Sequence, residues 1–436
     1  MSSTIWGVCG TCLLLIAIFL KMPVGFAMAL IGALGMYIVA GAASAFSLIA
    51  NEPFSVSSNY IYCAIPLFVF MGCVGSNTRM SEDAFFALNK WIGQLPGGLA
   101  MGAVGVCTIF AAMCADPIST AATITKASLG EMRRYKYSDQ LSLGTIAAAG
   151  NLGFLIPPSL VMIIYGILTE QSIGALFMAG VMPGLLVSVC FMVTIYILCK
   201  SNPKLALQGP KIGWMDRLKA SPRLIPVLII VALVMGGIYA GVFTPTEAAA
   251  WGVFAILLIS VITRQLSWKD YKTALSETSV ITGMIFMLII GAMIFSRFLV
   301  ICEVPSSLAN FIGGLEVPRL FILITVLITY TLLGCIMDLM SILIVAVPIL
   351  HPLLVELGFN PLWLAVLTVI TVLVGNVTPP VGIVVFALSG MVRDAQLFTI
   401  FRGVVPFIIT MLICLVILIA FPQISIWLPS MMSPGY

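Results

Sequence analysis

The sequence predicts an all-α polytopic membrane protein, and three observations support that prediction. Of the 436 residues, 61% are hydrophobic and only 8% are charged, with a mean hydropathy of +1.19. A soluble domain carries about 25% charged residues, so most of this surface must face lipid. Apolar runs of about 20 residues, the length of a membrane-spanning helix, recur along the chain. Gly and Pro interrupt these runs, which favours helices over barrel strands.

Ten full spans and two re-entrant hairpins account for these apolar runs. The expected spans are 4–20, 22–50, 59–77, 139–168, 171–199, 224–243, 245–263, 278–297, 361–392 and 398–428, and the expected hairpins are 97–130 and 319–350. The first run, from Ile5 to Leu20, has no basic segment before it and no small-residue cleavage site after it. It is therefore expected to be a span rather than a signal peptide.

Lysine and arginine set the expected orientation, because they accumulate in cytoplasmic loops. The most basic loops are 200–223, 133–136 and 264–272. A periplasmic N-terminus places all three loops inside and leaves only Arg297 and Arg319 outside, of 20 Lys and Arg. The net charge of +4 comes from such loops and indicates no nucleic-acid partner.

The chain also contains an internal repeat, first visible in two Pro-Pro pairs. Residues 153–159 read GFLIPPS, and residues 375–380 read GNVTPP. One shift along the chain, the repeat shift, carries Pro157 onto Pro379. The repeat shift also maps Pro23 to Pro245, Pro96 to Pro318, Asp116 to Asp338 and Ser119 to Ser341. Each half would hold five spans and one hairpin, and an odd number of spans inverts the second half in the membrane.

Each Pro-Pro pair is expected to break a helix inside the membrane. Proline lacks a backbone donor and pushes the preceding residue out of helical geometry. Irregular backbone at membrane depth must be buried in protein or line a cavity. Carbonyls freed before the break can bind a cation, and the helix N-terminus after it offers N–H groups to an anion.

Small polar residues mark the tips of both predicted hairpins. Residues 114–123 read CADPISTAAT, and residues 334–341 read GCIMDLMS. An aspartate inside a membrane is costly and marks a functional site by default. An aspartate before a helix start, as in Asp116-Pro117, is also a typical N-cap. Asp116 and Asp338 are therefore either caps or ion ligands, and Ser341 joins Asp338 as a candidate cation ligand.

No Lys or Arg occurs in 97–125, 139–168 or 320–392. An anion bound there must rely on helix N-termini, polar side chains and co-bound cations. The candidate substrate-binding residues are Ser119, Thr120, Asn151, Ser159, Asn376 and Thr378. Na⁺ is favoured over H⁺ as the coupling ion, because carbonyl and hydroxyl oxygens are plentiful whereas a proton relay needs chains of Asp, Glu and His.

The remaining reactive side chains predict no enzyme. The eleven cysteines are scattered, mostly in apolar runs, and are expected to be buried reduced thiols. His351, the only histidine, precedes Pro352 and is expected in a solvated outer loop. There is no His/Glu metal motif, no serine with a plausible base, and no Gly-rich loop ending in Lys-Ser/Thr for nucleotide phosphates.

The paired motifs resemble those of the large membrane subunit of tripartite ATP-independent periplasmic (TRAP) transporters, the DctM-like family. The family carries a run ending in Gly-x-x-Ile-Pro-Pro-Ser and a later Ile-Thr-Pro-Pro-Val-Gly. These stand here at 153–159 and 377–382. The hairpin before Glu131-Met132 and the segment from Met337-Asp338 to Val347-Pro348 are also similar to the family's.

The resemblance implies an inverted-repeat elevator-type transporter in the bacterial inner membrane. Two re-entrant hairpins and two Pro-Pro-broken helices would move as one transport domain against a scaffold. The implied domains are 1–96 (scaffold and interfacial arm), 97–168 (transport), 169–318 (scaffold and repeat linker), 319–392 (transport) and 393–436 (C-terminal scaffold helix). The implied partners are Na⁺, a small organic anion (a carboxylate or a sulfonate), a small four-helix membrane subunit and a periplasmic substrate-binding protein.

The same resemblance implies two Na⁺ sites. The first would involve Ser119, Gly150, Gly153 and Pro157, and the second Gly334, Gly375 and Thr378. This sequence departs from the family at Asp116-Pro117, where small residues are usual, and at Asn151, where a small or hydroxyl residue is usual. Other functions stay open: a divalent-anion/Na⁺ symporter without a binding protein, a proton-coupled or passive carrier, a channel or an exporter.

Overall fold

The computed structural model describes residues 3–114, 117–207, 209, 212–313, 317–392 and 394–432, with the backbone alone for 309–313. Every regular element within these ranges is a helix. The predicted all-α class is therefore confirmed for the part of the chain that the structure describes.

The first half of the chain runs from the N-terminus to the basic linker. Its elements are α1 (Ser3–Phe19), α2 (Val24–Ala40), α3 (Ala42–Ser58), η1 (Tyr60–Cys63), α4 (Ala64–Ser76), α5 (Met80–Ile92), α6 (Gly98–Ala111), α7 (Pro117–Arg134), α8 (Asp139–Gly150), η2 (Asn151–Phe154), α9 (Leu160–Thr169) and α10 (Ile173–Ser201).

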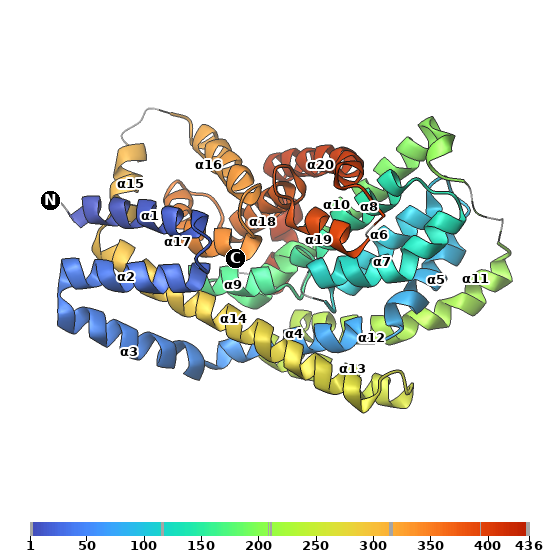
Figure 1. The fold of residues 1–436 in the computed structure, drawn as a ribbon, viewed down its shortest axis with the longest axis horizontal. Coiled ribbons are helices and arrows are strands. Elements are labelled where there is room, and N and C mark those ends of the chain that lie inside the picture. The colour runs from blue at the N-terminus through green and yellow to red at the C-terminus, as the bar shows by residue number, and fades with distance from the viewer. Residues whose placement is uncertain are drawn as a thin grey trace.

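A linker and the second half follow. The linker holds η3 (Pro203–Leu205), α11 (Trp214–Ala220) and η4 (Ser221–Leu224). The second half holds α12 (Ile225–Tyr239), α13 (Pro245–Ile262), α14 (Trp268–Ile301), α15 (Val304–Gly313), α16 (Arg319–Gly334), α17 (Leu339–Glu356), α18 (Pro361–Val377), α19 (Ile383–Met391), α20 (Leu397–Ala420) and α21 (Gln423–Met432). Figure 1 shows an elongated bundle with α1, α2 and α3 towards one end and α5 and α11 towards the other.

The element order agrees with the predicted repeat. The repeat shift that carries Pro157 onto Pro379 places α7 on residues 339–356, which are the bounds of α17. It places α6 within one residue of each bound of α16, and it pairs α2 with α13 and α9 with α19. The peptide bonds Pro157–Pro158 and Pro379–Pro380 are both cis.

Six helices in the described ranges are each long and apolar enough to cross a membrane: Ile173–Ser201, Trp214–Tyr239, Pro245–Ile262, Trp268–Ile301, Leu339–Glu356 and Leu397–Ala420. The bent pair Ala42–Ser58 and Tyr60–Ser76, with an angle of 59°, makes a seventh if it is one span. The other predicted spans fall on shorter apolar helices. The single span predicted at 22–50 is wrong, because Gly41 adopts a φ of 86° and ends α2 before α3 begins.

The contacts of α2 with α14 and of α8 with α20 both involve glycine. α2 packs on α14, where a Cβ added to Gly32 would lie 2.9 Å from Phe295 Cα. α8 packs on α20, where a Cβ added to Gly144 would lie 2.6 Å from Gly403 Cα. Small residues let helix backbones approach this closely, which is typical of helix contacts in membranes.

Candidate functional site

The first Pro-Pro break joins α8 to α9 through buried, irregular backbone. α8 ends at Gly150, one 3₁₀ turn covers Asn151–Phe154, and α9 begins at Leu160. Ser159 caps α9: its hydroxyl accepts from Met162 N at 3.4 Å and donates to Phe154 O at 2.6 Å. All residues from 150 to 160 are buried.

The start of α7 packs against this break. A Cβ added to Gly150 would lie 3.0 Å from Ala121 Cβ and 3.4 Å from Pro117 O. A Cβ added to Gly153 would lie 3.2 Å from Cys114 O and 3.7 Å from Thr120 Oγ1. The structure thus brings Gly150 and Gly153 to the segment that carries Ser119 and Thr120.

Pro157 of the first predicted site and Asp116 of the first hairpin tip do not join this contact among the described residues. A Cβ on Gly180 of α10 would lie 3.6 Å from Pro157 Cδ, so Pro157 faces α10. Asp116, the candidate cap or ligand at the hairpin tip, lies outside the described residues.

The second break joins α18 to α19 and packs against α16 and α17, the helix pair of the second predicted hairpin. A Cβ added to Gly375 would lie 2.6 Å from Gly334 Cα, so the ends of α16 and α18 touch through their backbones. Val381 N donates to Cys335 O at 3.3 Å. Thr378 donates its hydroxyl to Val374 O at 2.6 Å. Gly334, Gly375 and the turn after Thr378 are therefore gathered at one place.

Asp338 is an N-cap in this structure. Its carboxylate accepts from Ser341 N at 3.1 Å and from the Ser341 hydroxyl, at the start of α17. Of the two roles that the sequence leaves open, the cap role is therefore observed for Asp338. A role for Asp338 and Ser341 as Na⁺ ligands stays a prediction.

The two predicted amide side chains are buried without partners. Asn151 is 1% exposed, and neither its Nδ2 nor its Oδ1 has a hydrogen-bond partner among the described residues. Asn376 is 3% exposed, and its Oδ1 likewise has none. Buried polar atoms are nearly always paired in folded proteins, and exceptions need an explanation.

His351 is buried, so the prediction of a solvated loop is wrong. It lies inside α17 at 6% exposure, and its Nδ1 is 2.7 Å from Tyr165 Oη of α9. Tyr165 is itself 1% exposed, and the Thr368 side chain of α18 lies next to it. The sequence signal for this contact was a lone histidine in an apolar segment; it gave no indication of the partner, 186 residues away.

A second polar contact that sequence reasoning missed joins the ends of α7 and α19. Arg133 makes two hydrogen bonds of 2.9 Å to the Asp139 carboxylate and a contact of 2.8 Å to Asp394 Oδ2. Asp394 lies between α19 and α20, and the Arg133 guanidinium holds the pKa of its carboxyl below the ordinary value. This cluster is partly exposed.

Three of the cysteines also differ from expectation. Cys9, Cys12 and Cys63 are exposed free thiols. Cys9 and Cys12 form a C-x-x-C pair on the apolar helix α1. In an apolar membrane helix an exposed position faces lipid rather than water, which explains why an apolar run did not mean burial.

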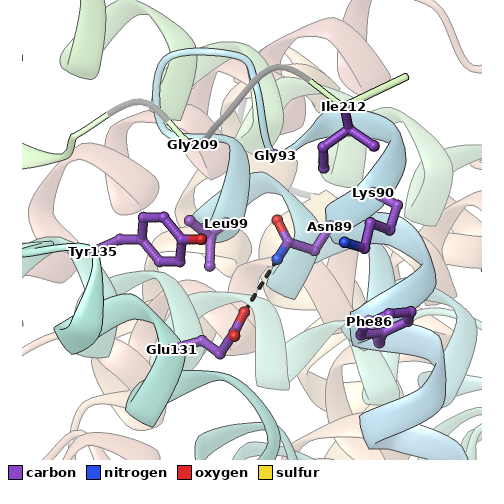
Figure 2. A pocket seen from close by; sticks show the side chains of 9 residues that line it. All are labelled: Phe86, Asn89, Lys90, Gly93, Leu99, Glu131, Tyr135, Gly209 and Ile212. Carbon is purple, nitrogen blue, oxygen red and sulfur yellow. Dashed lines mark hydrogen bonds between the residues drawn. The ribbon is translucent and has the colours of Figure 1, made fainter. Parts of the chain in front are cut away.

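Two cavities have linings without any predicted site residue. The smaller, about 80 Å³, lies between α5, the C-terminal part of α7 and the linker (Figure 2). There the Asn89 amide points at Glu131 and donates to its carboxylate at 3.2 Å. The larger, about 740 Å³, lies between η1, the turn after α9 and the turn after α12, with Tyr60, Glu170 and Phe243 in its wall.

Known proteins are similar to this chain along nearly its whole length. Residues 11–424 match the DctM component of the tripartite ATP-independent periplasmic transporters. The C4-dicarboxylate TRAP transporter large permease protein DctM of Pseudomonas aeruginosa is 32% identical, over 88% of this chain and 89% of its own. The sialic acid TRAP transporter large permease protein SiaM of Vibrio cholerae is 29% identical, over 95% and 96%.

The isethionate TRAP transporter permease protein DctMQ of Oleidesulfovibrio alaskensis is 32% identical, over 94% of this chain and 65% of its own. Two solved structures share the fold. The YdaH transporter of Alcanivorax borkumensis has a TM-score of 0.62 at 14% identity and covers 100% of this chain and 99% of its own. MtrF of Neisseria gonorrhoeae has a TM-score of 0.58 at 13% identity, over 98% and 95%.

The helix composition, the apolar spans and the near-complete family match agree with one another. The relatives are transporter permeases rather than enzymes. This chain is a multi-pass membrane protein that belongs to the DctM component family, the large permease subunits of TRAP transporters.

Proposed function

We propose that this chain is the translocating subunit of a Na⁺-coupled importer of small organic anions, working with a small four-helix membrane subunit and a periplasmic binding protein. Its N-terminus would lie in the periplasm of a bacterial inner membrane. The named relatives act on a C4-dicarboxylate, sialic acid and isethionate. Those names support an organic acid as the substrate class without selecting one.

The observation that carries the proposal is the twice-built contact between a helix pair and a Pro-Pro break. Gly153 and Gly375 are equivalent in the repeat. Gly153 contacts the turn between α6 and α7, and Gly375 contacts the end of α16, before α17 begins. Broken helices in transporters use unwound carbonyls for Na⁺ and helix N-termini for anions. The absence of Lys and Arg from 139–168 and 320–392 makes a co-bound cation the available positive charge.

The donor atoms fit Na⁺. The hydroxyls of Thr378 and Ser341 give their protons to Val374 O and to Asp338, so their oxygen lone pairs stay available to a cation. Ser119, Gly150, Gly153 and Pro157 would form the first Na⁺ site. Gly334, Asp338, Ser341, Gly375 and Thr378 would form the second. Bound Na⁺ would supply positive charge beside the anion.

The proposed mechanism is an elevator movement. Residues 97–168 and 319–392 would move as one body against a scaffold made of 1–96, 169–318 and 393–436. Contacts between the halves support a single moving body, because α17 packs on α9 and α7 packs on α19. The Tyr165–His351 hydrogen bond joins the second helix pair to the first break.

Uptake into proteoliposomes tests this function. The chain would be reconstituted with its small subunit and binding protein, and labelled dicarboxylates, sugar acids and small sulfonates would be offered with an inward Na⁺ or K⁺ gradient. We expect uptake only with Na⁺ and binding protein together. Uptake by the chain alone would favour a symporter that needs no binding protein, and uptake that ignores Na⁺ would refute the coupling.

A further inference from the structure

The buried amides of Asn151 and Asn376 differ in their hydrogen bonding from the predicted substrate-binding residues Ser159 and Thr378. The hydroxyls of Ser159 and Thr378 already donate to Phe154 O and Val374 O. Asn151, by contrast, keeps a two-proton donor and an acceptor that no described residue satisfies. Because both ends of this amide are unpaired, exchanging the assigned N and O atoms leaves the result unchanged.

The two amides also belong to elements that touch. Asn151 opens η2 and Asn376 is the penultimate residue of α18, and these two elements pack on each other. Asn376 adds an unpaired Oδ1. Together the two side chains present two unpaired amide oxygens and the unpaired NH₂ group of Asn151, besides the NH₂ group of Asn376, at the predicted substrate site.

This set of atoms restricts the ligand. A carboxylate or sulfonate can only accept hydrogen bonds at neutral pH, so it satisfies Asn151 Nδ2 and leaves both amide oxygens unpaired. A ligand that also donates satisfies them. An ammonium donor would need a nearby carboxylate. The break segments 140–168 and 361–392 contain no Asp or Glu, and the Asp338 carboxylate already accepts from the backbone N–H and the hydroxyl of Ser341. A neutral hydroxyl donates its one proton to one of the two amide oxygens without a counter-charge.

We infer that Asn151, assisted by Asn376, selects an organic anion that carries a hydroxyl group. The Asn151 NH₂ group donates to the ligand, and one of the two amide oxygens accepts the single proton of the ligand's hydroxyl. This inference rests on the proposed function, because it assigns the substrate class to the same site.

Three series of small anions isolate the hydroxyl. Each series compares a hydrogen, a hydroxyl and an ammonium on one acid: succinate, malate and aspartate; propionate, lactate and alanine; ethanesulfonate, isethionate and taurine. Apparent affinities would come from the thermal stabilisation of the purified full chain in detergent at saturating Na⁺. We expect the hydroxyl member of at least one series to bind about tenfold more tightly than its two companions.

Asn151→Ala tests the assignment directly. We expect the tenfold preference to fall to about onefold, with no decrease in the melting temperature of the ligand-free protein, because the substitution removes a buried polar group that lacks a partner. Asn376→Ala is the second variant and should reduce the preference part of the way. Asn51→Ala, at an exposed position on α3, is the matched control and should keep it.

Two results would overturn the inference. One is equal binding of the hydroxyl member and its companions in all three series, or no binding of any member. The other is an unchanged preference in Asn151→Ala with a raised half-saturating Na⁺ concentration, which would make the amide oxygen a Na⁺ ligand. Either result leaves the proposed function standing if uptake still requires Na⁺, whereas Na⁺-independent uptake would refute the function itself.

Discussion

The two Pro-Pro breaks have related sequences but different surroundings. Residues 150–160 at the first break are all buried, whereas Pro379 and Pro380 at the second are exposed. The second break nevertheless makes the tighter backbone contact. A Cβ on Gly375 would lie 2.6 Å from Gly334 Cα, whereas one on Gly153 would lie 3.2 Å from Cys114 O. Burial and close backbone packing therefore vary independently between equivalent segments.

The two polar contacts between the halves, Tyr165–His351 and Arg133–Asp394, have no counterparts in the repeat. The repeat shift pairs Tyr165 with Ala387 and His351 with Leu129, and both of these partners are apolar. It pairs Arg133 with Val355 and Asp394 with Ser172, so each polar contact occurs once. The repeat preserves the backbone plan because proline, glycine and caps act locally. Contacts between the halves depend on individual side chains, which have diverged.

The largest expected loss of stability is at Gly375, and its repeat equivalent Gly153 is the comparison. Gly375→Ala forces a methyl group against the Gly334 backbone, which cannot move without separating α16 from α18. We expect a loss of about 1–3 kcal/mol and of Na⁺-dependent uptake. Gly153→Ala meets one carbonyl oxygen at 3.2 Å and should cost less. Melting temperatures of the two purified variants check this order, and equal losses would show that the two breaks are packed alike.

The Tyr165–His351 hydrogen bond should give the next effect. Tyr165→Phe leaves His351 Nδ1 without its partner in a buried site, which costs about 1–3 kcal/mol. His351→Leu removes one partner of the Tyr165 hydroxyl, which keeps the Thr368 side chain beside it, so this variant should lose less. The double variant should therefore lose less than the sum of the single losses.

Thermal or denaturant unfolding of the four proteins measures that coupling. Tyr60→Phe, at 59% exposure, is the control and should have little effect. Additive losses in the cycle would mean that the two side chains stabilise the protein independently.

The smallest effect belongs to the Arg133–Asp394 ion pair. Asp394→Asn should lower the melting temperature slightly, because the pair is exposed and Arg133 keeps Asp139. The pKa of Asp394 is lowered by Arg133, so the stabilisation is fully present above the ordinary aspartate pKa of about 3.9 and is lost as pH falls through the lowered value.

Melting temperatures of the wild type and Asp394→Asn at several pH values and salt concentrations test this pair. The difference between them should be constant above about pH 5, decline as the pH falls below about 4, disappear only below the lowered pKa of Asp394, and shrink in high salt. The difference made by Tyr165→Phe should not respond to salt. A salt-independent effect of Asp394→Asn would contradict the assignment to an exposed ion pair.

The sequence predicted the features that depend on local chemistry. Proline and glycine marked both breaks and both predicted hairpins, and the repeat shift found in the sequence carries the observed bounds of α7 onto those of α17. It did not predict the end of α2 at Gly41, because many glycines in this chain lie within helices. It also assigned His351 to a loop, because proline follows it, although the helix α17 accommodates both Pro348 and Pro352.

In the candidate site, too, the sequence predicted which segments take part but not how their side chains are paired. Hydrophobic patterning located the segments, and the structure brings Gly150 and Gly153 to α7 and Gly334 to Gly375. Sequence alone could not separate the occupied hydroxyls of Ser159 and Thr378 from the unpaired amide of Asn151. The two hydroxyls donate to Phe154 O and Val374 O, five and four residues earlier in the chain, so the difference depends on the backbone course through each break.

The contact between α8 and α20 has a kinetic consequence. Side chains that interlock fix two helices at one relative height, since any displacement must take a ridge out of one groove and into the next. Gly144 and Gly403 bring the two backbones together without such a ridge. At this point of the contact, no side-chain ridge opposes a change in their relative height. If α8 travels against α20, this pair of glycines keeps the activation barrier for that displacement low.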